Sequence, residues 1–195
     1  VFRRIAERCW GSKAAADFSD IEGMALAAKK VQDRQYAQEC LILCSFMWPI
    51  TDSEFTSDHL GDTALESKLL SAVTGRDIDE EGLYRIAERI FNLNRAILIR
   101  EGHRGTKDDQ LPDAWYTIPL KTDMTNPEML VPGKGDEAVC RKDEVVNRED
   151  FESMKREYYQ IRQWDVETGL QTKAKLAELE LEDVAIELEK QGLVR

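Results

Sequence analysis

The residues with the most chemical interest lie in one short apolar segment, Glu39-Cys-Leu-Ile-Leu-Cys44. If a helix continued through it, Cys40 and Cys44 would stand one turn apart, about 5–6 Å between their Cβ atoms. Two thiols so placed could hold a soft metal ion. The alternative, that both are small buried apolar residues, is how free cysteine usually behaves. The spacing favours this alternative, because iron–sulfur and zinc sites normally take four ligands and no companions lie at suitable spacing.

The acidic residue that opens the segment, Glu39, allows two interpretations. Its carboxylate is either a solvated residue at the edge of the apolar run or an acceptor for N–H groups of a buried partner or ligand. Beyond Cys44 the run continues through Phe46 and Met47, so the expected helix end is apolar on every side. Such a helix end is buried, faces a partner domain or lines a cofactor. The residues alone leave these alternatives open.

The other residues that could do chemistry are few and scattered. Cys9 and Cys140 belong to no C-x-x-C pair, and neither His59 nor His103 has a second histidine one turn away. Both histidines lie in polar contexts and are predicted to be surface residues. The chain also lacks a P-loop and a G-x-G-x-x-G motif. An enzyme contained wholly within this chain is therefore not expected.

Composition and charge exclude further classes of function. Asp and Glu number 38 against 27 Lys and Arg, which gives a formal net charge of -11. A field of that sign repels phosphate backbones and anionic lipid surfaces, so we expect neither nucleic acid nor a membrane as a partner. No stretch approaches the roughly 18 apolar residues of a membrane span. Four cysteines and no secretory signal predict reduced thiols and a cytoplasmic protein.

The elements that position the segment are predicted to be helices, because apolar residues recur at helical spacing nearly everywhere. The segment itself is expected to belong to a helix over 33–48 that Pro49 stops. A second helix is expected over about 63–73, with Gly75 as its C-cap. The residues of this second helix that are expected to point inward are Leu65, Leu69, Ala72 and Val73.

Capping patterns predict the remaining helices. Asp77 and Glu80 form a capping-box pattern before the clearest apolar run, which Gly102 closes. Asn147 is expected to cap the next helix, and Thr172 the last helical pair.

Between these groups the helical period disappears, and four of the five prolines fall in the gap. Strand-like alternation is limited to short pieces such as 115–118. A loop of this length is usually functional or draped over a neighbouring surface. The predicted fold is all-α and multihelical, in one unit over 1–195. It comprises a helical cluster over about 1–105, a Pro/Gly-rich excursion over about 106–146 and a second cluster over about 147–195.

Four blocks of the sequence, in order, resemble motifs of the aldehyde:ferredoxin oxidoreductase family of tungsten or molybdenum bis-pyranopterin enzymes. Gln35–Phe46 resembles the family's D-x-x-x-L-C segment, and Leu70–Asp77 its A-V-T-G turn. Ala87–Gly102 resembles the E-R-I-x-N-L-x-R-A-x-x-x-R-E-G helix, followed at Asp108–Pro112 by a D-x-L-P motif. Tyr158–Gly169 resembles the Y-Y-x-x-x-G-W-D-x-x-T-G ending. The resemblance covers essentially the whole chain and concerns the family's C-terminal helical domain.

The resemblance implies one domain of a larger enzyme. Three cysteines of the family's 4Fe-4S cluster come from an upstream C-x-x-C-x-x-x-C run, which this sequence lacks, and the fourth matches Cys44. Glu39 matches the acidic residue that hydrogen-bonds the pterin, and Leu43 the residue whose backbone carbonyl faces it. The implied partners are the N-terminal and middle domains of the same enzyme and ferredoxin or another redox protein. The implied reaction is oxidation of aldehydes to carboxylic acids, and the chain alone is expected to bind no cofactor and to be inactive.

The sequence also departs from the family pattern. Glu39 replaces the usual Asp, and Ile42 stands where some members have Gly. Gln163 and Glu180 fall where Gly is expected, and Gln171 where Pro is expected. These departures predict a divergent branch and leave the substrate open, since the family also includes reduction of aromatic acyl thioesters. The alternative class of function is a stand-alone helical interaction module that kept the fold and lost cofactor binding.

Overall fold

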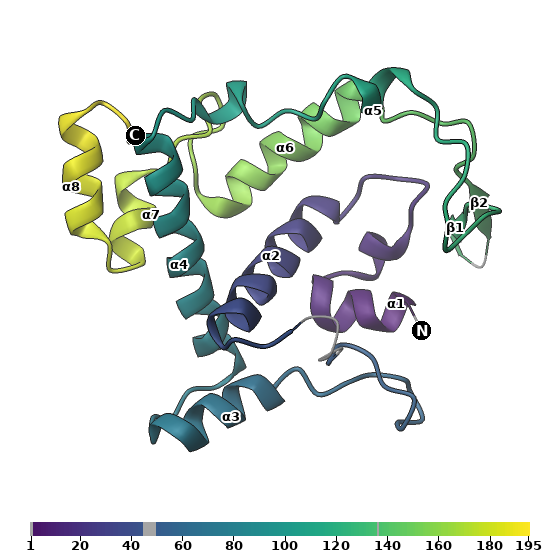
Figure 1. Ribbon diagram of the computed structural model, residues 1–195, viewed down its shortest axis with the longest axis horizontal. Coiled ribbons are helices and arrows are strands. Elements are labelled where there is room, and N and C mark those ends of the chain that lie inside the picture. Colours follow the sequence, from purple (N-terminus) through teal and green to yellow (C-terminus); the bar gives the residue numbers. More distant parts are fainter. Residues whose placement is uncertain (1, 45–49, 136) are drawn as a thin grey trace.

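The structure is a computed structural model that describes residues 2–44, 50–135 and 137–195 (Figure 1). Its α-helices are α1 (Phe2–Ile5), α2 (Met24–Cys40), α3 (Leu65–Thr74), α4 (Glu80–Arg100), α5 (Ala114–Thr117), α6 (Arg148–Arg162), α7 (Lys173–Glu178) and α8 (Glu182–Lys190). The smaller elements are a π-helical turn (Ala6–Trp10), two 3₁₀ turns (Lys13–Ala16 and Gly105–Lys107) and the strands β1 (Leu130–Pro132) and β2 (Ala138–Cys140). The predicted all-α, multihelical fold is confirmed. Within these ranges, the helices are too short or too polar to cross a membrane.

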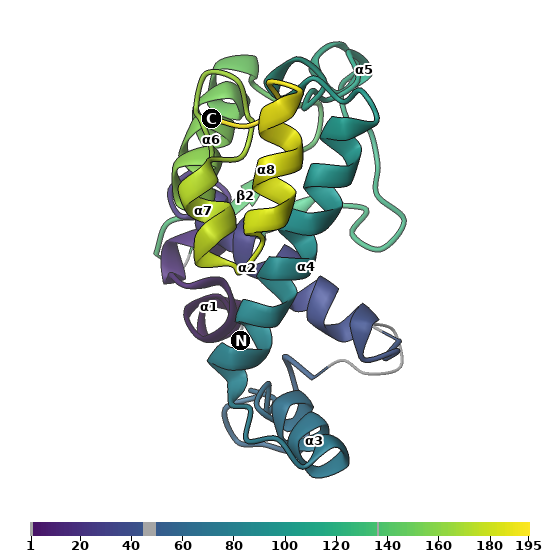
Figure 2. The same cartoon turned by 90° about the vertical axis from the view of Figure 1, so that its left-hand side faces the viewer.

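Three long helices form the centre of the molecule. Helix α2 lies against both α4 and α6 (Figure 1). Figure 2 shows α7 and α8 running beside α4, where they close an apolar core. The buried residues of this core are Ala96, Leu176, Leu179, Leu181, Ala185, Leu188 and Val194. The helices after the excursion therefore pack directly on those before it.

Side-chain caps start three of these helices. Asn147 accepts the N–H groups of two residues in the first turn of α6, at 2.8 and 3.1 Å, and Thr172 caps α7 with one bond of 3.1 Å. Both predictions are confirmed. The cap of α4 is Asp79, whose carboxylate accepts the Gly82 N–H at 2.8 Å. The capping box predicted at Asp77 is therefore wrong by two residues, because the helix begins at Glu80 and Asp79 is the residue that directly precedes it.

Helix α3 has the predicted extent and ends, as predicted, at Gly75, which adopts φ 70°. Its inward face is not the predicted one. The residues expected to point inward, Leu65, Leu69, Ala72 and Val73, are all exposed. Glu66 is buried in their place, with one carboxylate oxygen 3.3 Å from Nη2 of Arg34 on α2. The ion pair between Glu66 and Arg34 of α2 therefore determines which side of α3 faces the rest of the molecule.

The excursion between α4 and α6 contains short helices and strands. Residues 115–118, expected as strand, fall largely in the single helical turn α5, because four residues are too few for alternation to decide between helix and strand. Strands β1 and β2 pair antiparallel, with Val131 opposite Val139. The Phe18 N–H donates to the Pro132 carbonyl at 2.9 Å, so strand β1 of the excursion contacts the N-terminal segment.

Candidate functional site

The three residues singled out by the sequence lie at the C-terminal end of α2. The helix stops one residue after Glu39, and Ile42 adopts the left-handed conformation with φ 61°. The Ile42 N–H donates to the Glu39 carbonyl at 2.9 Å, and the Leu43 N–H to the Gln38 carbonyl at 3.0 Å. These two bonds form a Schellman ending, which reverses the chain immediately before Cys44.

This ending corrects the helix expected over 33–48. Cys40 is the last residue of α2 and Cys44 lies beyond the turn, so the two thiols do not stand one helical turn apart. An isoleucine in the left-handed conformation gives no stop signal in a sequence, which is why the apolar run was predicted to stay helical. Pro49, predicted as the stop, lies outside the described residues.

Glu39 and Leu43 present different groups to their surroundings. The Glu39 side chain is exposed, and its carboxylate accepts a hydrogen bond of 2.8 Å from the amide of Gln35, one turn earlier. Leu43 is half-buried, and its N–H is held by the Schellman ending.

The four cysteines differ in exposure. Cys44, Cys40 and Cys140 are exposed, whereas Cys9 is half-buried. Burial raises the pKa of the Cys9 thiol, which disfavours the thiolate that metals bind. Among the residues that the structure describes, no three His, Cys, Asp or Glu side chains gather as a metal site. The end of α2 therefore carries two exposed thiols, Cys40 and Cys44, and among the described residues no further metal-binding side chain gathers with them.

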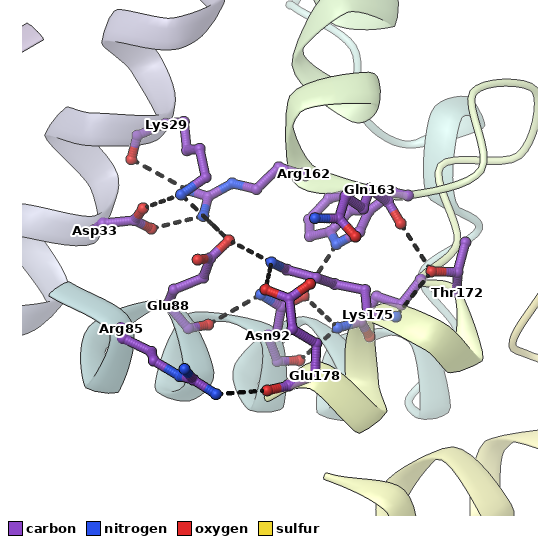
Figure 3. A network of polar contacts seen from close by, with 12 residues as sticks. Lys29, Asp33, Arg85, Glu88, Asn92, Arg162, Gln163, Thr172, Lys175 and Glu178 are labelled. Atoms are coloured by element: carbon purple, nitrogen blue, oxygen red, sulfur yellow. Dashed lines mark hydrogen bonds and ion pairs between the residues drawn. The ribbon is translucent and has the colours of Figure 1, made fainter. Parts of the chain in front are cut away.

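A buried charge network anchors α2 to its neighbours (Figure 3). Arg162 of α6 is fully buried, with Nη1 2.6 Å from Oδ1 of Asp33 on α2 and Nη2 donating to the Lys29 carbonyl at 3.3 Å. The Lys29 ammonium lies 2.7 Å from the Asp33 carboxylate and 3.2 Å from that of Glu88 on α4. Because a buried ion pair has few alternative geometries, this network fixes the rotation of α2 and with it the direction of its end.

Glu88 links the network to the C-terminal helices. Its carboxylate lies 3.3 Å from the ammonium of Lys175 on α7 and 3.7 Å from Nη1 of Arg162. Burial would raise the pKa of Glu88, but the nearby ammonium groups of Lys29 and Lys175 outweigh it and hold the pKa below its usual range. The carboxylate is thus ionised at neutral pH, and it joins α2, α4, α6 and α7 through one group.

A neutral network continues from α4 to the segment after α6 (Figure 3). The fully buried Asn92 accepts hydrogen bonds at Oδ1 from Trp164 Nε1, at 3.0 Å, and from Gln171 Nε2, at 2.8 Å. Trp164 is itself buried, so its ring packs within the fold. Gln171, which stands where the family pattern expects Pro, supplies a side-chain donor that proline lacks.

A cavity of about 490 Å³ lies between α2, α4 and α6, with much of its wall aromatic. Tyr36 of α2 meets the ring edge of Phe91, and Phe91 stacks on Trp164 with 5.9 Å between ring centroids. At its wall, Arg95 Nη2 lies 2.6 Å from Oδ2 of Asp109. The cavity wall therefore offers aromatic faces beside an already paired charge.

Asp109 also corrects one expectation about the histidines. His59 is exposed, as predicted, but His103 is half-buried, with Nε2 3.4 Å from Oδ1 of Asp109. The Tyr159 hydroxyl donates to Asp109 at 2.6 Å. Burial would raise the pKa of Asp109, but the hydrogen bonds from Arg95 and Tyr159 outweigh it and lower the pKa. The D-x-L-P motif thus supplies the acceptor for a buried arginine.

The missing glycines of the family pattern have a backbone explanation. Ile42, Gln163 and Glu180 all adopt left-handed conformations, with φ 61°, 56° and 57°. Each follows a helix in a Schellman ending, and the next residue donates its N–H to the carbonyl five residues back, at 2.9–3.0 Å. Glycine adopts this conformation without a Cβ penalty. The chain therefore keeps the three turns and accepts strain at each.

Residues 4–181 match the family model described as "Aldehyde ferredoxin oxidoreductase, domains 2 & 3". The matched range includes Glu39, Leu43 and Cys44, and every residue of the charge network that anchors α2.

Proposed function

The chain belongs to the aldehyde ferredoxin oxidoreductase family, and from this membership we propose that it completes the cofactor site of such an enzyme. In this proposal Cys44 is a thiolate ligand of a 4Fe-4S cluster, Glu39 accepts hydrogen bonds from a pyranopterin, and Leu43 offers it a backbone carbonyl. The reaction is oxidation of aldehydes to carboxylic acids, with electrons leaving through ferredoxin or another redox protein. The N-terminal and middle domains of the same enzyme are its partners.

The observation that carries the proposal is the contrast between the two parts of α2. Its body is fastened by the buried pair of Arg162 and Asp33, while its end presents Glu39 and Cys44 to solvent. A functional group must be held within a fraction of an ångström to act reproducibly. Glu39 lies on the last turn of the anchored helix, and Cys44 directly follows the hydrogen-bonded turn that ends it. An exposed thiol on an anchored support is what a cluster shared between domains requires.

The side chains suit these roles chemically. Thiolate is the ligand that iron–sulfur clusters take from proteins. A carboxylate accepts hydrogen bonds through two oxygens, which suits the amino and N–H donors of a pterin. Glu39 is one methylene longer than the Asp of the family pattern, so its carboxylate reaches further from the helix end. When bound, the pterin-held tungsten or molybdenum supplies the two-electron oxidation, and the cluster supplies single-electron transfer.

The test uses the full-length enzyme that contains this chain. Cys44→Ala should lose iron and acid-labile sulfide after anaerobic purification, because in this proposal Cys44 is the one thiolate that the chain gives to the cluster. Cys40→Ala and Cys140→Ala are matched controls, since both thiols are exposed and their removal should change stability little.

Full iron content in the Cys44→Ala enzyme would contradict the ligand role and favour an interaction module without cofactors. Equal iron loss in all three variants would also contradict it, since general destabilisation would then explain the effect.

A further inference from the structure

We propose that the cavity between α2, α4 and α6 binds a small, neutral and flat aromatic molecule of about two fused rings. Its volume of about 490 Å³ lies in the lower half of the roughly 300–1,000 Å³ typical of ligand sites. Folded proteins are close-packed, with few voids larger than a water molecule, so an opening of this size indicates room for a ligand. Glu39, Leu43 and Cys44 do not line the cavity, so this inference is independent of the proposed function.

The cavity has a buried side and an open side. The buried lining residues, which we call the floor, are Ala25, Arg95, Lys155, Tyr159 and Trp164. The exposed lining residues, which we call the mouth, are Ala28, Gln32, Asn94, Leu98 and Gln110. A molecule can therefore enter from solvent and come to rest against buried groups.

The charges of the floor favour a neutral ligand over an anion. Arg95 donates from Nη1 and Nη2 to the two carboxylate oxygens of Asp109, at 2.9 and 2.6 Å. Lys155 donates to the Asp109 carbonyl at 3.2 Å and to the Glu152 carboxylate at 2.9 Å. Both floor cations are thus already paired, and an anionic ligand would give up its hydration without gaining a partner charge.

The aromatic rings do not favour a cationic ligand either. Ring faces can attract cations, but here the protein's own guanidinium groups already lie over them. The central carbon of the Arg95 guanidinium is 4.8 Å from the Trp164 ring centroid. That of Arg162 is 4.1 Å from the Phe91 centroid and 5.3 Å from that of Tyr158. A ligand cation would meet two like charges at short range and be repelled, so a neutral molecule fits best.

The lining rings favour an aromatic ligand over an aliphatic one. Tyr36 meets Phe91 nearly at a right angle, with 5.1 Å between ring centroids, and Tyr158 meets Trp164 in the same way at 6.0 Å. Aromatic rings prefer such edge-to-face contacts or offset stacking, and a flat aromatic ligand can make either with these side chains. At the mouth, side-chain amides provide polar partners for a carbonyl oxygen of the ligand.

The experiment is a calorimetric titration of the full-length enzyme with coumarin, a neutral bicyclic aromatic molecule that carries a carbonyl. One coumarin should bind per chain with a Kd of about 10–100 µM, the scale for a ligand of this size. Two matched compounds test the chemistry. Octahydrocoumarin keeps the carbonyl but lacks the flat rings, and coumarin-3-carboxylate adds a negative charge. Each should bind about tenfold more weakly than coumarin.

Variants at the mouth test where coumarin binds. Ala28→Phe places a large side chain at the entrance, and because Ala28 is exposed the fold should tolerate it. Binding should weaken at least about tenfold. Val31→Phe, on the same helix and outside the cavity lining, is the matched control and should bind like the parent. Leu98→Trp repeats the test from α4, with Leu93→Trp as its control outside the lining.

Absence of coumarin binding at millimolar concentration would overturn the proposal, as would equal affinity for octahydrocoumarin or for coumarin-3-carboxylate. Binding that survives both Ala28→Phe and Leu98→Trp would also overturn it, since coumarin would then occupy another place in the enzyme. The readout is binding itself, so the result does not depend on whether Cys44 holds iron. Failure here leaves the proposed function standing, and full iron in the Cys44→Ala enzyme leaves the ligand site standing.

Discussion

Replacing Ile42 by glycine should stabilise the chain, although it removes a large apolar side chain. Ile42 is held in the left-handed conformation at φ 61° by the Schellman ending of α2. A β-branched residue is among the poorest occupants of that conformation, because its Cβ substituents crowd the backbone. The substitution keeps the turn and removes the crowding.

The size of the effect follows from the exposure and conformation of Ile42. The side chain is 92% exposed, so its removal forfeits almost no hydrophobic burial. A left-handed L-residue costs about 1–2 kcal/mol, and glycine adds about 0.5–1 kcal/mol of backbone entropy on folding. The difference is a gain of roughly 0.5–1 kcal/mol in the free energy of unfolding. For a chain of this length, the gain corresponds to a rise in Tm of about 1–4 °C.

Thermal unfolding followed by far-UV circular dichroism measures this directly. Ile42→Ala is the matched control, because alanine removes the β-branch but keeps the Cβ that the left-handed conformation disfavours. Glycine should exceed alanine in Tm, and the same order should hold for Gln163→Gly against Gln163→Ala. Equal Tm values for the glycine and alanine variants, or a lower Tm for glycine than for the parent, would refute the reasoning.

Three further predictions concern the stability of the charge network around Arg162, the loss of folding stability at low pH, and cluster binding by the isolated chain. Arg162→Met should cost about 3–5 kcal/mol in urea unfolding, because it leaves the buried Asp33 carboxylate without its closest cation; a loss under about 1 kcal/mol would contradict this. The Asp109 carboxylate, held by Arg95, has a lowered pKa in the folded state, so its contribution is present above the usual aspartate pKa and is lost as pH falls through the folded value. Asp109→Asn should therefore lose less stability on acidification than the parent, and parallel pH profiles would count against it. Anaerobic reconstitution of the 195-residue chain with iron and sulfide should give no stoichiometric four-iron cluster by visible absorption; a full cluster would show that the chain's other cysteines complete the site.

Helix boundaries set by local chemistry could be predicted from the sequence. Asn147 and Thr172 cap their helices as expected, because the cap bond joins residues two or three apart in the chain. Gly75 likewise ends α3 in the left-handed conformation. The end of α2 could not be predicted, because Ile42 performs the same backbone role as Gly75 with a residue that normally avoids it.

Contacts between distant segments decided what local patterns could not. Spacing on α3 predicts a buried face containing Leu69, yet the pair of Arg34 and Glu66 turns the opposite side inward. The anchoring network escaped prediction for the same reason, since Arg162 and Asp33 are far apart in sequence. The one available signal was the four-residue spacing of Lys29 and Asp33, which is typical of an ion pair on one helix face.

The sequence predicted which residues belong to the candidate site, and the structure corrected how those residues are arranged. The match of Cys44 and Glu39 to one motif placed both at one position in the fold, and the structure puts both at the end of α2. The expected pairing of Cys40 with Cys44 depended on an unbroken helix, and it disappears with the turn at Ile42. A motif therefore indicated which residues gather there, whereas backbone conformation determined how they are presented.

The central claim is that the end of α2 delivers one thiolate to an iron–sulfur cluster. Anomalous diffraction at the iron edge from crystals of the full-length enzyme tests it most directly, because it locates iron independently of any variant. We expect an iron atom bonded to Sγ of Cys44 and none at Cys40, with the Glu39 carboxylate beside a pterin. Iron bonded to Cys40, Cys9 or Cys140, or no iron bonded to any cysteine of this chain, would contradict it.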